Sequence, residues 1–566
     1  MSTLTDLLIG MEKHKSIFEN EIRNLSIPTC SDFGSSENPQ PISFTPSGEK
    51  LESKDSDKVK QAFQNSFEQA VLKSSGKNPS PLSNKRVAVL FSGGPAAGGH
   101  NVVYGLKKIL GVNNTLLGVK AGPKGLIQGD LFEITDQNIA PVINTGGFDF
   151  LGSDRTKIKS DEQFQSVKKT CIDNNLDAIV VVGGDDSNTN AAILAEFLSK
   201  DVKSDGSGVQ VIGVPKTIDG DLQIGDILPI SFGFDTATKI YAEMVGNILQ
   251  DTPSSRKYWH FIKVMGRSAS HVALEVALQT KPAIALISEE VAEKSIPLSA
   301  IVDQIAKAVV NRSNKGINHG VVLIPEGIIE FIPEMNALIA ELNDKVAMFH
   351  SELSAKNNEE KRNFMYAKLT PEHAQLMASL PDYIEDMLLA DRDSHGNLQV
   401  SLIPTERLLI DMVKVRVSEL DQSAPFATLN HFFGYEGRCG APTLFDAAYC
   451  YNLGLTAGSL ILSGKTGYMA SIADLNGGGE PLGIPLPGLL NIERRQGKDE
   501  FVIEKALADT KSPAMEFFTS RREAWASEDL FSSPGPRQLW GPVSRQIPIT
   551  VALNRKYSSL DFNIGK

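Results

Sequence analysis

Short runs of apolar, often β-branched residues recur along the chain from Lys85 onward and alternate with longer amphipathic stretches. The clearest runs are RVAVLF at 86–91, LDAIVVV at 176–182, VQVIGV at 209–214, HFIKVMG at 260–266, AIALIS at 283–288 and GVVLIP at 320–325. Strands that alternate with helices are typical of parallel sheets with helices on both faces. The pattern therefore predicts an α/β protein built from Rossmann-like, three-layer α/β/α domains.

The apolar runs fall into two groups, one ending near residue 214 and the other starting near residue 259, which predicts two α/β domains. A chain of 566 residues is also too long for one ordinary hydrophobic core. The predicted division has a partly helical leader at 1–84, a first domain at 85–214 with later returning segments, a second domain at 215–330 and about 400–500, a helical insertion at 331–400 and a C-terminal segment at 501–566. The pattern assigns no role to the leader or to the C-terminal segment.

Composition and charge narrow the class of protein. The formal net charge of −12 argues against a nucleic acid or an anionic membrane as partner, because either favours a basic surface. The four cysteines show no CxxC spacing, so we expect neither a disulfide framework nor a zinc site, and a reducing cytoplasm fits.

The first residues lack the regions of a signal peptide, so we expect them to stay on the mature protein. The uncharged stretch 447–464 contains Asn, Thr, Ser and Tyr and is interpreted as a buried helix, not a membrane span.

Ligands of doubly wound sheets gather where strands end, so the residues after each apolar run carry the candidate chemistry. The first such loop, SGGPAAGGHN, places Gly93 and Gly94 between a strand and a helix that opens near Asn101, and its backbone N–H groups can hold a phosphate. The GxxxxG spacing fits a Walker A motif, but His100 and Asn101 stand where Lys and Ser or Thr are required, and GxGxxG is missing. A tight strand-to-helix turn is the alternative.

The second loop, GGDDSNTNA at 183–191, sets two adjacent carboxylates after a glycine pair. Asp185 is well placed to hold a Mg²⁺ ion, which would neutralise phosphate oxygens during transfer. The alternative is a helix cap, a position that Asp also favours. The pair raises a question of its own, because the second carboxylate, Asp186, repels phosphate.

The third loop, VPKTIDGDL at 214–222, brings a cation, a hydroxyl and two carboxylates into one short segment after a strand: Lys216, Thr217, Asp219 and Asp221. Phosphoryl transfer to an alcohol needs a base that takes the hydroxyl proton and a positive group on the moving phosphoryl. The segment therefore predicts a phosphoryl-transfer site, with a solvated turn as the alternative.

A fourth set of residues lies in the predicted second domain, in RKYWHFIKVMGRSASH (256–271), IPEG (324–327) and FFGYEGRCGAP (432–442). Arg267 and Arg438 stand in strand-end or loop contexts, where a guanidinium can grip a phosphate with two hydrogen bonds. Glu326 would suit sugar hydroxyls. Surface arginines are common, so neither arginine alone predicts a site. His100 and His271 are interpreted as packing or helix-start residues.

Taken in order, SGGPAAGGHN, GGDDSNTNA, PKTIDGDL, FGFDTATKIYAE, MGRSASHVALE, IPEG and YEGRCGAP resemble the motifs of the phosphofructokinase family. The resemblance covers roughly residues 85–470 and is closest to the long, pyrophosphate-dependent branch of that family. It implies the phosphofructokinase fold and reversible phosphoryl transfer from pyrophosphate to the 1-hydroxyl of fructose 6-phosphate, with Mg²⁺ as cofactor, in glycolysis or gluconeogenesis. Pro95 and Ala96 stand where members often carry Gln-Ala or Ile-Pro, so we expect an altered loop shape with function retained.

The resemblance implies a role for each residue of the catalytic loops. Gly94 and Lys216 would bind pyrophosphate, Asp185 would hold Mg²⁺, and Asp219 would accept the proton of the sugar hydroxyl. The implied catalytic set is Asp219, Lys216, Asp186 and Thr217.

Fructose 6-phosphate binding is implied for a larger set: Thr217, Ile218, Asp219, Lys257, Tyr258, Met265, Gly266, Arg267, Glu326, Tyr435, Glu436, Gly437 and Arg438. Lys257 and Tyr258 match the pair that family members lend to the site of a neighbouring subunit. The resemblance therefore implies a homodimer whose sites are shared between subunits.

Two positions are expected to decide the phosphoryl donor, because ATP-using relatives typically carry glycine where Asp186 and Lys216 stand. Asp186 would fill and negatively charge the space of the nucleotide's α-phosphate, and Lys216 would stabilise charge on the transferring phosphoryl group and on departing phosphate. Two alternatives remain. An ATP-dependent phosphofructokinase shares the fold, and a non-catalytic regulatory subunit, of the kind found in plant enzymes, would have degraded catalytic loops.

Overall fold

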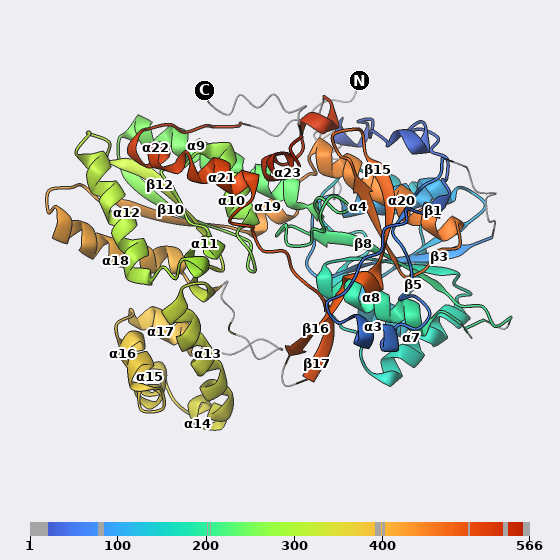
Figure 1. The fold of residues 1–566 in the computed structure, drawn as a ribbon, viewed down its shortest axis with the longest axis horizontal. Coiled ribbons are helices and arrows are strands. Elements are labelled where there is room, and N and C mark those ends of the chain that lie inside the picture. The colour runs from blue at the N-terminus through green and yellow to red at the C-terminus, as the bar shows by residue number, and fades with distance from the viewer. Residues whose placement is uncertain are drawn as a thin grey trace, which may run out of the picture. The chain divides into compact units, whose positions relative to one another are not determined.

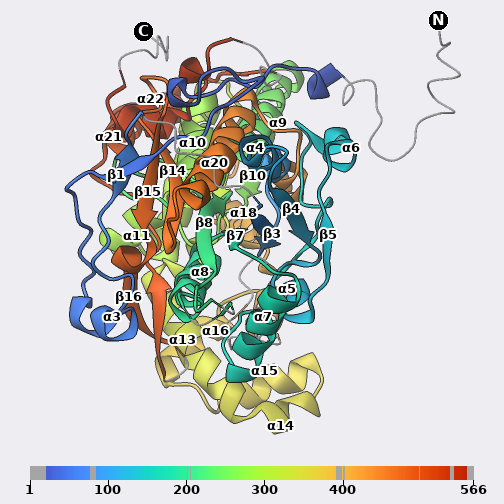
Figure 2. The ribbon, with the colours of Figure 1, turned by 90° about the vertical axis from the view of Figure 1, so that its right-hand side faces the viewer.

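The computed structural model describes residues 21–76, 84–200, 202–203, 205–390, 398, 402–495, 498–535 and 541–557 (Figures 1 and 2). The chain forms two compact units. The first unit comprises Met1–Ala237, Glu436–Ala506 and Gln538–Lys566, and the second comprises Thr238–Tyr435 and Leu507–Arg537.

The first unit is built on one large, mixed sheet. Among the described residues its eleven strands are β1 (Phe44–Pro46), β2 (Leu72–Ser74), β3 (Arg86–Ser92), β4 (Thr115–Val119), β5 (Leu131–Glu133), β6 (Ser153–Asp154), β7 (Ala178–Gly183), β8 (Gln210–Thr217), β9 (Phe232–Gly233), β14 (Tyr468–Ala473) and β15 (Glu480–Pro485). The main order is β1-β2-β15-β14-β8-β7-β3-β4-β5, with β6 on β3 and β9 on β8. The centre from β14 to β4 is parallel, and the carboxyl ends of its strands therefore meet at one edge.

The helices of this unit are α3 (Ser56–Ala62), α4 (Gly99–Leu110), α5 (Gly122–Gln128), α6 (Asp136–Ile139), α7 (Asp161–Asp173), α8 (Asp185–Phe197), α20 (Leu444–Leu462) and α23 (Ile549–Asn554). Figure 2 shows α4 and α20 side by side, and a Cβ on Gly105 would collide with the carbonyl oxygen of Tyr451. A Cβ on Gly454 would likewise meet the carbonyl oxygen of Val102, so these glycines permit the close packing of the two helices. All of α20 is buried, which confirms the interpretation of 447–464. Within the described ranges, no helix combines the length and hydropathy of a membrane span.

The structure adds two features to the expectations for the first unit. The predicted leader is in part a piece of the sheet, because β1 and β2 extend its edge through antiparallel pairing with β15. The expected α/β class is confirmed, and β5 and β15 add antiparallel pairs to the parallel centre of the sheet. Strands of three residues such as β1 and β2 show no measurable alternation of apolar and polar positions, so the pattern could not predict them. The residues after β15 form a separate hairpin of β16 (Leu490–Arg495) and β17 (Lys498–Ile503).

The second unit contains a parallel sheet with the order β11-β12-β10-β13. These strands are β11 (Ile284–Ala285), β12 (His319–Pro325), β10 (Tyr258–Val264) and β13 (Thr428–Phe433). Its helices are α9 (Phe234–Ser255, which begins in the first unit), α10 (His271–Thr280), α11 (Ser288–Glu293), α12 (Leu298–Ser313), α18 (Thr405–Leu420), α21 (Pro513–Thr519) and α22 (Arg522–Ser527). The edge strand β13 was not predicted, because its outward residues are partly exposed and break the apolar run.

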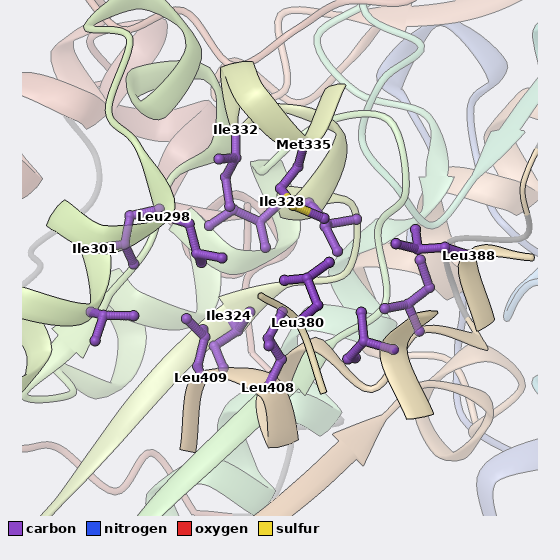
Figure 3. Close-up of a cluster of buried hydrophobic side chains, with 14 of the residues drawn as sticks. Leu298, Ile301, Ile324, Ile328, Ile332, Met335, Leu380, Leu388, Leu408 and Leu409 are labelled. Carbon is purple, nitrogen blue, oxygen red and sulfur yellow. The ribbon is translucent and has the colours of Figure 1, made fainter. Parts of the chain in front are cut away.

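The stretch between β12 and α18 is helical, as expected: α13 (Pro333–Met348), α14 (His350–Ser354), α15 (Asn358–Tyr366), α16 (Pro371–Ala378) and α17 (Asp382–Leu388). These helices share one hydrophobic core with the sheet of the second unit. Figure 3 shows this core, in which Ile324 of β12, Leu408 and Leu409 of α18, and Leu380 lie together. The helical stretch is therefore packed onto the second unit through apolar side chains.

The division of the chain differs from the predicted one at two places. Residues 215–237 and 436–506 belong to the first unit, because β14 pairs with β8 and α20 packs on α4. Residues 507–537 belong to the second unit, where the buried guanidinium of Arg312 donates to the carbonyl oxygen of Glu528 at 2.8 Å. Contacts between segments so distant in sequence leave no local pattern.

Candidate functional site

The glycine loop of the first unit follows β3 and ends at α4. Gly93 has a φ of +85°, a conformation that favours glycine. A Cβ on Gly93 would lie 3.6 Å from Nζ of Lys216. A Cβ on Gly94 would lie 3.6 Å from Nη1 of Arg438 and 3.7 Å from Nη2 of Arg155. The loop backbone thus faces three cationic side chains, which is the arrangement expected of an anion site.

The two aspartates of the second loop lie in the first turn of α8, directly after β7. Carboxylates in a first turn are favourably placed relative to the helix dipole. Burial raises the pKa of Asp185; the charge of Lys505 opposes the shift, and the charges of Asp186 and Asp221 add to it. The Oγ of Ser187 donates a hydrogen bond of 2.8 Å to Oγ of Ser92 and so ties this loop to the glycine loop.

The third loop begins inside β8, which runs three residues further than predicted and includes Lys216 and Thr217. Lys216 is 8% exposed. Burial lowers its pKa to about 8, while the charges of Asp219, Asp185 and Asp221 oppose the shift. The N–H of Asp219 donates a 3.1 Å hydrogen bond to Oγ1 of Thr217, which orders the turn after the strand. The structure thus brings one ammonium group and three carboxylates together at the strand ends.

The carboxylates of this cluster are oxygen ligands of the kind that Mg²⁺ prefers. In the part of the chain that the structure describes, no group of three or more His, Cys, Asp or Glu residues has the arrangement of a metal site. Mg²⁺, however, is usually bound through one or two carboxylates and the phosphates of a substrate. Asp185, whose charge interacts with that of Asp221, fits this kind of site.

Two residues of this cluster were not predicted. Arg155 follows β6, a strand of two residues that leaves no apolar run in the sequence. Lys505 follows β17, and its Nζ lies 3.1 Å from Oδ2 of Asp221. No sequence signal marks Lys505, because only the long-range fold brings it to the cluster.

The YEGR segment, Tyr435–Arg438, is divided between the two units. Tyr435 belongs to the second unit, and the other three residues belong to the first. Tyr435 is 68% exposed. A Cβ on Gly146 would collide with the carbonyl oxygens of Cys439 and Gly440, so a close backbone approach positions Arg438 beside the glycine loop. The resemblance implied a sugar-binding role for Arg438, and its position in the first unit places it against an anion loop.

The second unit brings together the loops after β10 and β12. Oε2 of Glu326 accepts a 3.0 Å hydrogen bond from the N–H of Gly266. A Cβ on Gly327 would collide with the carbonyl oxygen of Arg267, so the loops approach too closely for any other residue there. Burial raises the pKa of Glu326, opposed by the Gly266 N–H and by the charges of Lys263 and Arg267. A buried carboxylate next to a guanidinium can recognise hydroxyl and phosphate groups of a sugar phosphate.

Lys257 and Tyr258 lie apart from these loops, at the amino end of β10. Met265, Gly266 and Arg267 follow the carboxyl end of the same seven-residue strand, about 20 Å away at the usual rise per residue. Tyr258 has a φ of +75°, and Nζ of Lys257 lies 4.8 Å from the centre of its ring. Within one chain the structure therefore does not bring this pair together with the sugar-phosphate candidates.

His100 and His271 are a packing residue and a helix-start residue, as the sequence analysis interprets them. The buried His100 ring contacts Oγ1 of Thr145 through Nδ1 at 3.0 Å, and His271 begins α10 and is buried there. All four cysteines are free: Cys30, Cys171, Cys439 and Cys450.

Comparison with known proteins gives concordant matches. The family model described as Phosphofructokinase matches residues 86–461. The chain is 47% identical to "Pyrophosphate--fructose 6-phosphate 1-phosphotransferase" of Treponema pallidum over 85% of this chain and 85% of that protein. It is 46% identical to "Pyrophosphate--fructose 6-phosphate 1-phosphotransferase subunit beta" of Solanum tuberosum, over 83% of this chain and 82% of that protein. Among solved structures, a pyrophosphate-dependent phosphofructokinase from Marinobacter aquaeolei matches with a TM-score of 0.50 and 16% identity, covering 81% of this chain and 97% of that one, which shows a shared fold.

Proposed function

Because the chain belongs to the phosphofructokinase family, we propose that it is a pyrophosphate-dependent 6-phosphofructokinase, with the activity that its curated relatives are named for. It transfers a phosphoryl group from pyrophosphate to the 1-hydroxyl of fructose 6-phosphate, and fructose 1,6-bisphosphate and phosphate result. The reaction is reversible, because pyrophosphate is a donor of modest free energy, and serves glycolysis or gluconeogenesis. Lys216 carries the proposal most directly: a buried ammonium faces the glycine loop and is surrounded by the three carboxylates of the strand ends.

Asp219 acts as the base. Its turn follows β8 and is ordered by the bond to Thr217, so the carboxylate is held close to the ammonium of Lys216. It removes the proton from the 1-hydroxyl as that oxygen attacks a phosphorus of pyrophosphate. Lys216 stabilises the negative charge of the transferring phosphoryl group and of the departing phosphate. The N–H groups of the glycine loop bind the remaining phosphate oxygens. The side chains of Arg155 and Arg438, which face this loop, bind them as well.

Asp185 is the proposed ligand of Mg²⁺. Its carboxylate lies in the first turn of α8 and provides an oxygen ligand of the kind that this ion prefers. When bound, Mg²⁺ neutralises phosphate oxygens during transfer. The chain's own contribution is to hold Asp185 at the helix start, where the Ser187–Ser92 hydrogen bond fixes the loop.

Asp186 is the proposed determinant of donor choice. It lies beside Asp185 in the first turn of α8, and its charge acts on that carboxylate. A negative group there repels and blocks an α-phosphate, whereas pyrophosphate ends before that position. This favours pyrophosphate over an ATP-dependent activity. A non-catalytic regulatory role is not favoured either, because Asp185, Lys216 and Asp219 are all present and gathered in one cluster.

Fructose 6-phosphate is the proposed ligand of the second unit's loops. Arg267 supplies a cation for the 6-phosphate, and Glu326 accepts sugar hydroxyls. Sugar contacts are also proposed for Thr217, for Ile218 and for the YEGR segment, residues 435–438. Met265 and Gly266 fix the loop, since Gly266 donates to Glu326 and the N–H of Met265 donates to the carbonyl oxygen of Phe433 at 2.9 Å.

The proposed enzyme is a homodimer whose subunits lend Lys257 and Tyr258 to each other's sites. The separation of this pair from the Met265–Arg267 loop along β10 supports the proposal, because the same chain does not bring them together. We place the enzyme in the cytoplasm, a reducing compartment, in keeping with its four free cysteines.

The reaction is tested by incubating the purified protein with Mg²⁺, pyrophosphate and fructose 6-phosphate and following phosphorus resonances by NMR. The expected products are phosphate and a sugar that carries phosphoryl groups on carbons 1 and 6. Hydrolysis of pyrophosphate without a second phosphoryl group on the sugar would refute the proposed transfer.

A further inference from the structure

Residues 499–506, which we call the C-terminal strap, contact two parts of the first unit that carry candidate carboxylates. These parts are helix α8, which begins with Asp185, and the loop after β8, which contains Asp219 and Asp221. The N–H of Ile503 donates to Oγ1 of Thr189 at 3.0 Å, and Thr189 belongs to α8, the helix that begins with Asp185. The N–H of Ala506 donates to the carbonyl oxygen of Asp221 at 2.7 Å. The strap therefore links the helix of the metal candidate to the loop of the proposed base.

The strap is anchored in the hydrophobic core of the first unit. Val502 and Ile503 are buried, and Ile503 packs in the same cluster as residues of β7 and α8. β17 also pairs with β16 over six residue pairs. Lys505 thus extends from a fixed backbone, and its side chain is directed to the carboxylate cluster by the strap rather than by a mobile loop.

The side chain of Lys505 joins this cluster as a second ammonium group. Nζ of Lys505 lies 3.1 Å from Oδ2 of Asp221, whose side chain is 5% exposed. Burial acts to lower the pKa of Lys505, but the charges of Asp221, Asp185 and Asp219 outweigh it and hold that pKa above its usual range. The same three carboxylates act on Lys216. Two cations from opposite parts of the sequence therefore face one set of carboxylates.

We propose that Lys505 is a positioning residue of the phosphoryl-transfer site, which fixes Asp221 and offsets the charge of the carboxylate cluster so that pyrophosphate can bind. The inference rests on the proposed function. Pyrophosphate is a polyanion, and a buried carboxylate that has lost its partner repels it at short range. By pairing with Asp221, Lys505 leaves Asp185 for the metal and Asp219 for the sugar hydroxyl.

The test compares three variants of the full-length protein. Lys505→Met removes the charge and keeps much of the volume, and Lys505→Arg restores a cation. The matched control is Lys54→Met, which breaks the ion pair of Lys54 with Glu504, a residue of the strap. The side chain of Lys54 is 73% exposed and that of Glu504 is 52% exposed. For each we measure KM for pyrophosphate and for fructose 6-phosphate, and the Kd of methylenediphosphonate with Mg²⁺ by calorimetry.

Lys505→Met is expected to raise both KM for pyrophosphate and the Kd of methylenediphosphonate about tenfold or more, with KM for fructose 6-phosphate nearly unchanged. Lys505→Arg should recover most of the loss, and Lys54→Met should resemble the wild type. In an Asp221→Asn background, Lys505→Met should cost much less, because the charge that it balances is gone.

Three results would overturn the inference: unchanged binding of methylenediphosphonate in Lys505→Met, equal losses for both substrates, or the same loss in Lys54→Met, which would make the strap a purely structural clip. Failure of the proposed function can be distinguished from failure of the Lys505 inference. If the proposed function is wrong, the wild-type protein binds methylenediphosphonate but does not phosphorylate fructose 6-phosphate. The calorimetry of the Lys505 variants then still tests the role of Lys505.

Discussion

The ammonium group of Lys216 faces the backbone of Gly93, since a Cβ at that glycine would lie 3.6 Å from Nζ. Lys216 is the penultimate residue of β8 and Gly93 follows β3, two strands that flank β7 in the sheet. An anion held by the N–H groups of the glycine loop therefore meets a positive charge that is already in place. Only the parallel arrangement of these strands creates this contact.

The charge of Lys216 predicts an alkaline limit to activity. Burial lowers the pKa of Lys216 to about 8, against the opposing charges of Asp219, Asp185 and Asp221. The side chain is thus cationic below that pH and becomes neutral as pH rises through it, so kcat/KM for pyrophosphate should fall above about pH 8, since this quantity reports the pKa values of the free enzyme. Lys216→Arg, which stays charged, should lose this limb whatever its maximal rate. A wild-type profile that stays flat well above pH 8 would contradict the assignment.

Replacement of the base should affect turnover far more than sugar binding. Asp219→Ser is expected to lower kcat by a factor on the order of 10³, the usual range for a positioned general base. Steady-state kinetics give kcat, and the Kd of fructose 6-phosphate from calorimetry serves as the control. Near-normal turnover would remove Asp219 as the base. A large loss of sugar affinity would make it a binding residue instead.

The sequence predicts that most candidate residues lie at strand ends, because the carboxyl ends of parallel strands meet at one edge of each sheet. Gly93, Asp185 and Lys216 follow apolar runs of the first unit's sheet, and Glu326 follows one of the second unit's sheet, so their placement at strand ends follows from the pattern alone. Lys505 was missed because its position depends on a hairpin that packs against α8 far along the chain.

Three of the strands that were not predicted leave a weak signal in the sequence. β1 and β2 have three residues each, too few for a period, and β13 alternates poorly because it is an edge strand. Their positions are set by pairing with distant strands, which local propensity does not encode.

Stability of the second unit should depend on one buried arginine. Arg312 on α12 is 1% exposed; its guanidinium lies 2.9 Å from Oδ1 of Asp529 and donates to the carbonyl oxygens of His319 at 3.1 Å and Glu528 at 2.8 Å. Arg312→Met leaves these acceptors without their donor and should lower the free energy of unfolding by about 2–4 kcal/mol. Denaturation followed by the fluorescence of the buried Trp259 and Trp525 measures this.

The control for that variant lies on the same helix. Lys307 pairs with Asp303 while 61% exposed, so Lys307→Met should change the free energy of unfolding by less than about 0.5 kcal/mol. Equal effects of Arg312→Met and Lys307→Met would show that the buried guanidinium does not hold the segment 507–537 in place.

Shared sites predict complementation between two inactive variants. If Lys257 acts in the partner's site, Lys257→Ala and Asp219→Ser should each be nearly inactive alone. A mixed dimer then contains one site with an intact Asp219 and an intact Lys257. Subunits mixed in equal amounts, dissociated and reassembled should recover about a quarter of wild-type activity. Mixtures that remain as inactive as the separate variants would contradict the sharing of Lys257.

Donor choice tests the account most directly, through the ratio of kcat/KM for pyrophosphate to kcat/KM for ATP with fructose 6-phosphate and Mg²⁺. We predict that wild-type protein favours pyrophosphate by at least about a hundredfold, and that the double variant Asp186→Gly, Lys216→Gly shifts the ratio toward ATP by tenfold or more. A wild-type protein that prefers ATP, or a ratio that the double variant leaves unchanged, would contradict the assignment of Asp186 and Lys216 as the residues that select the donor.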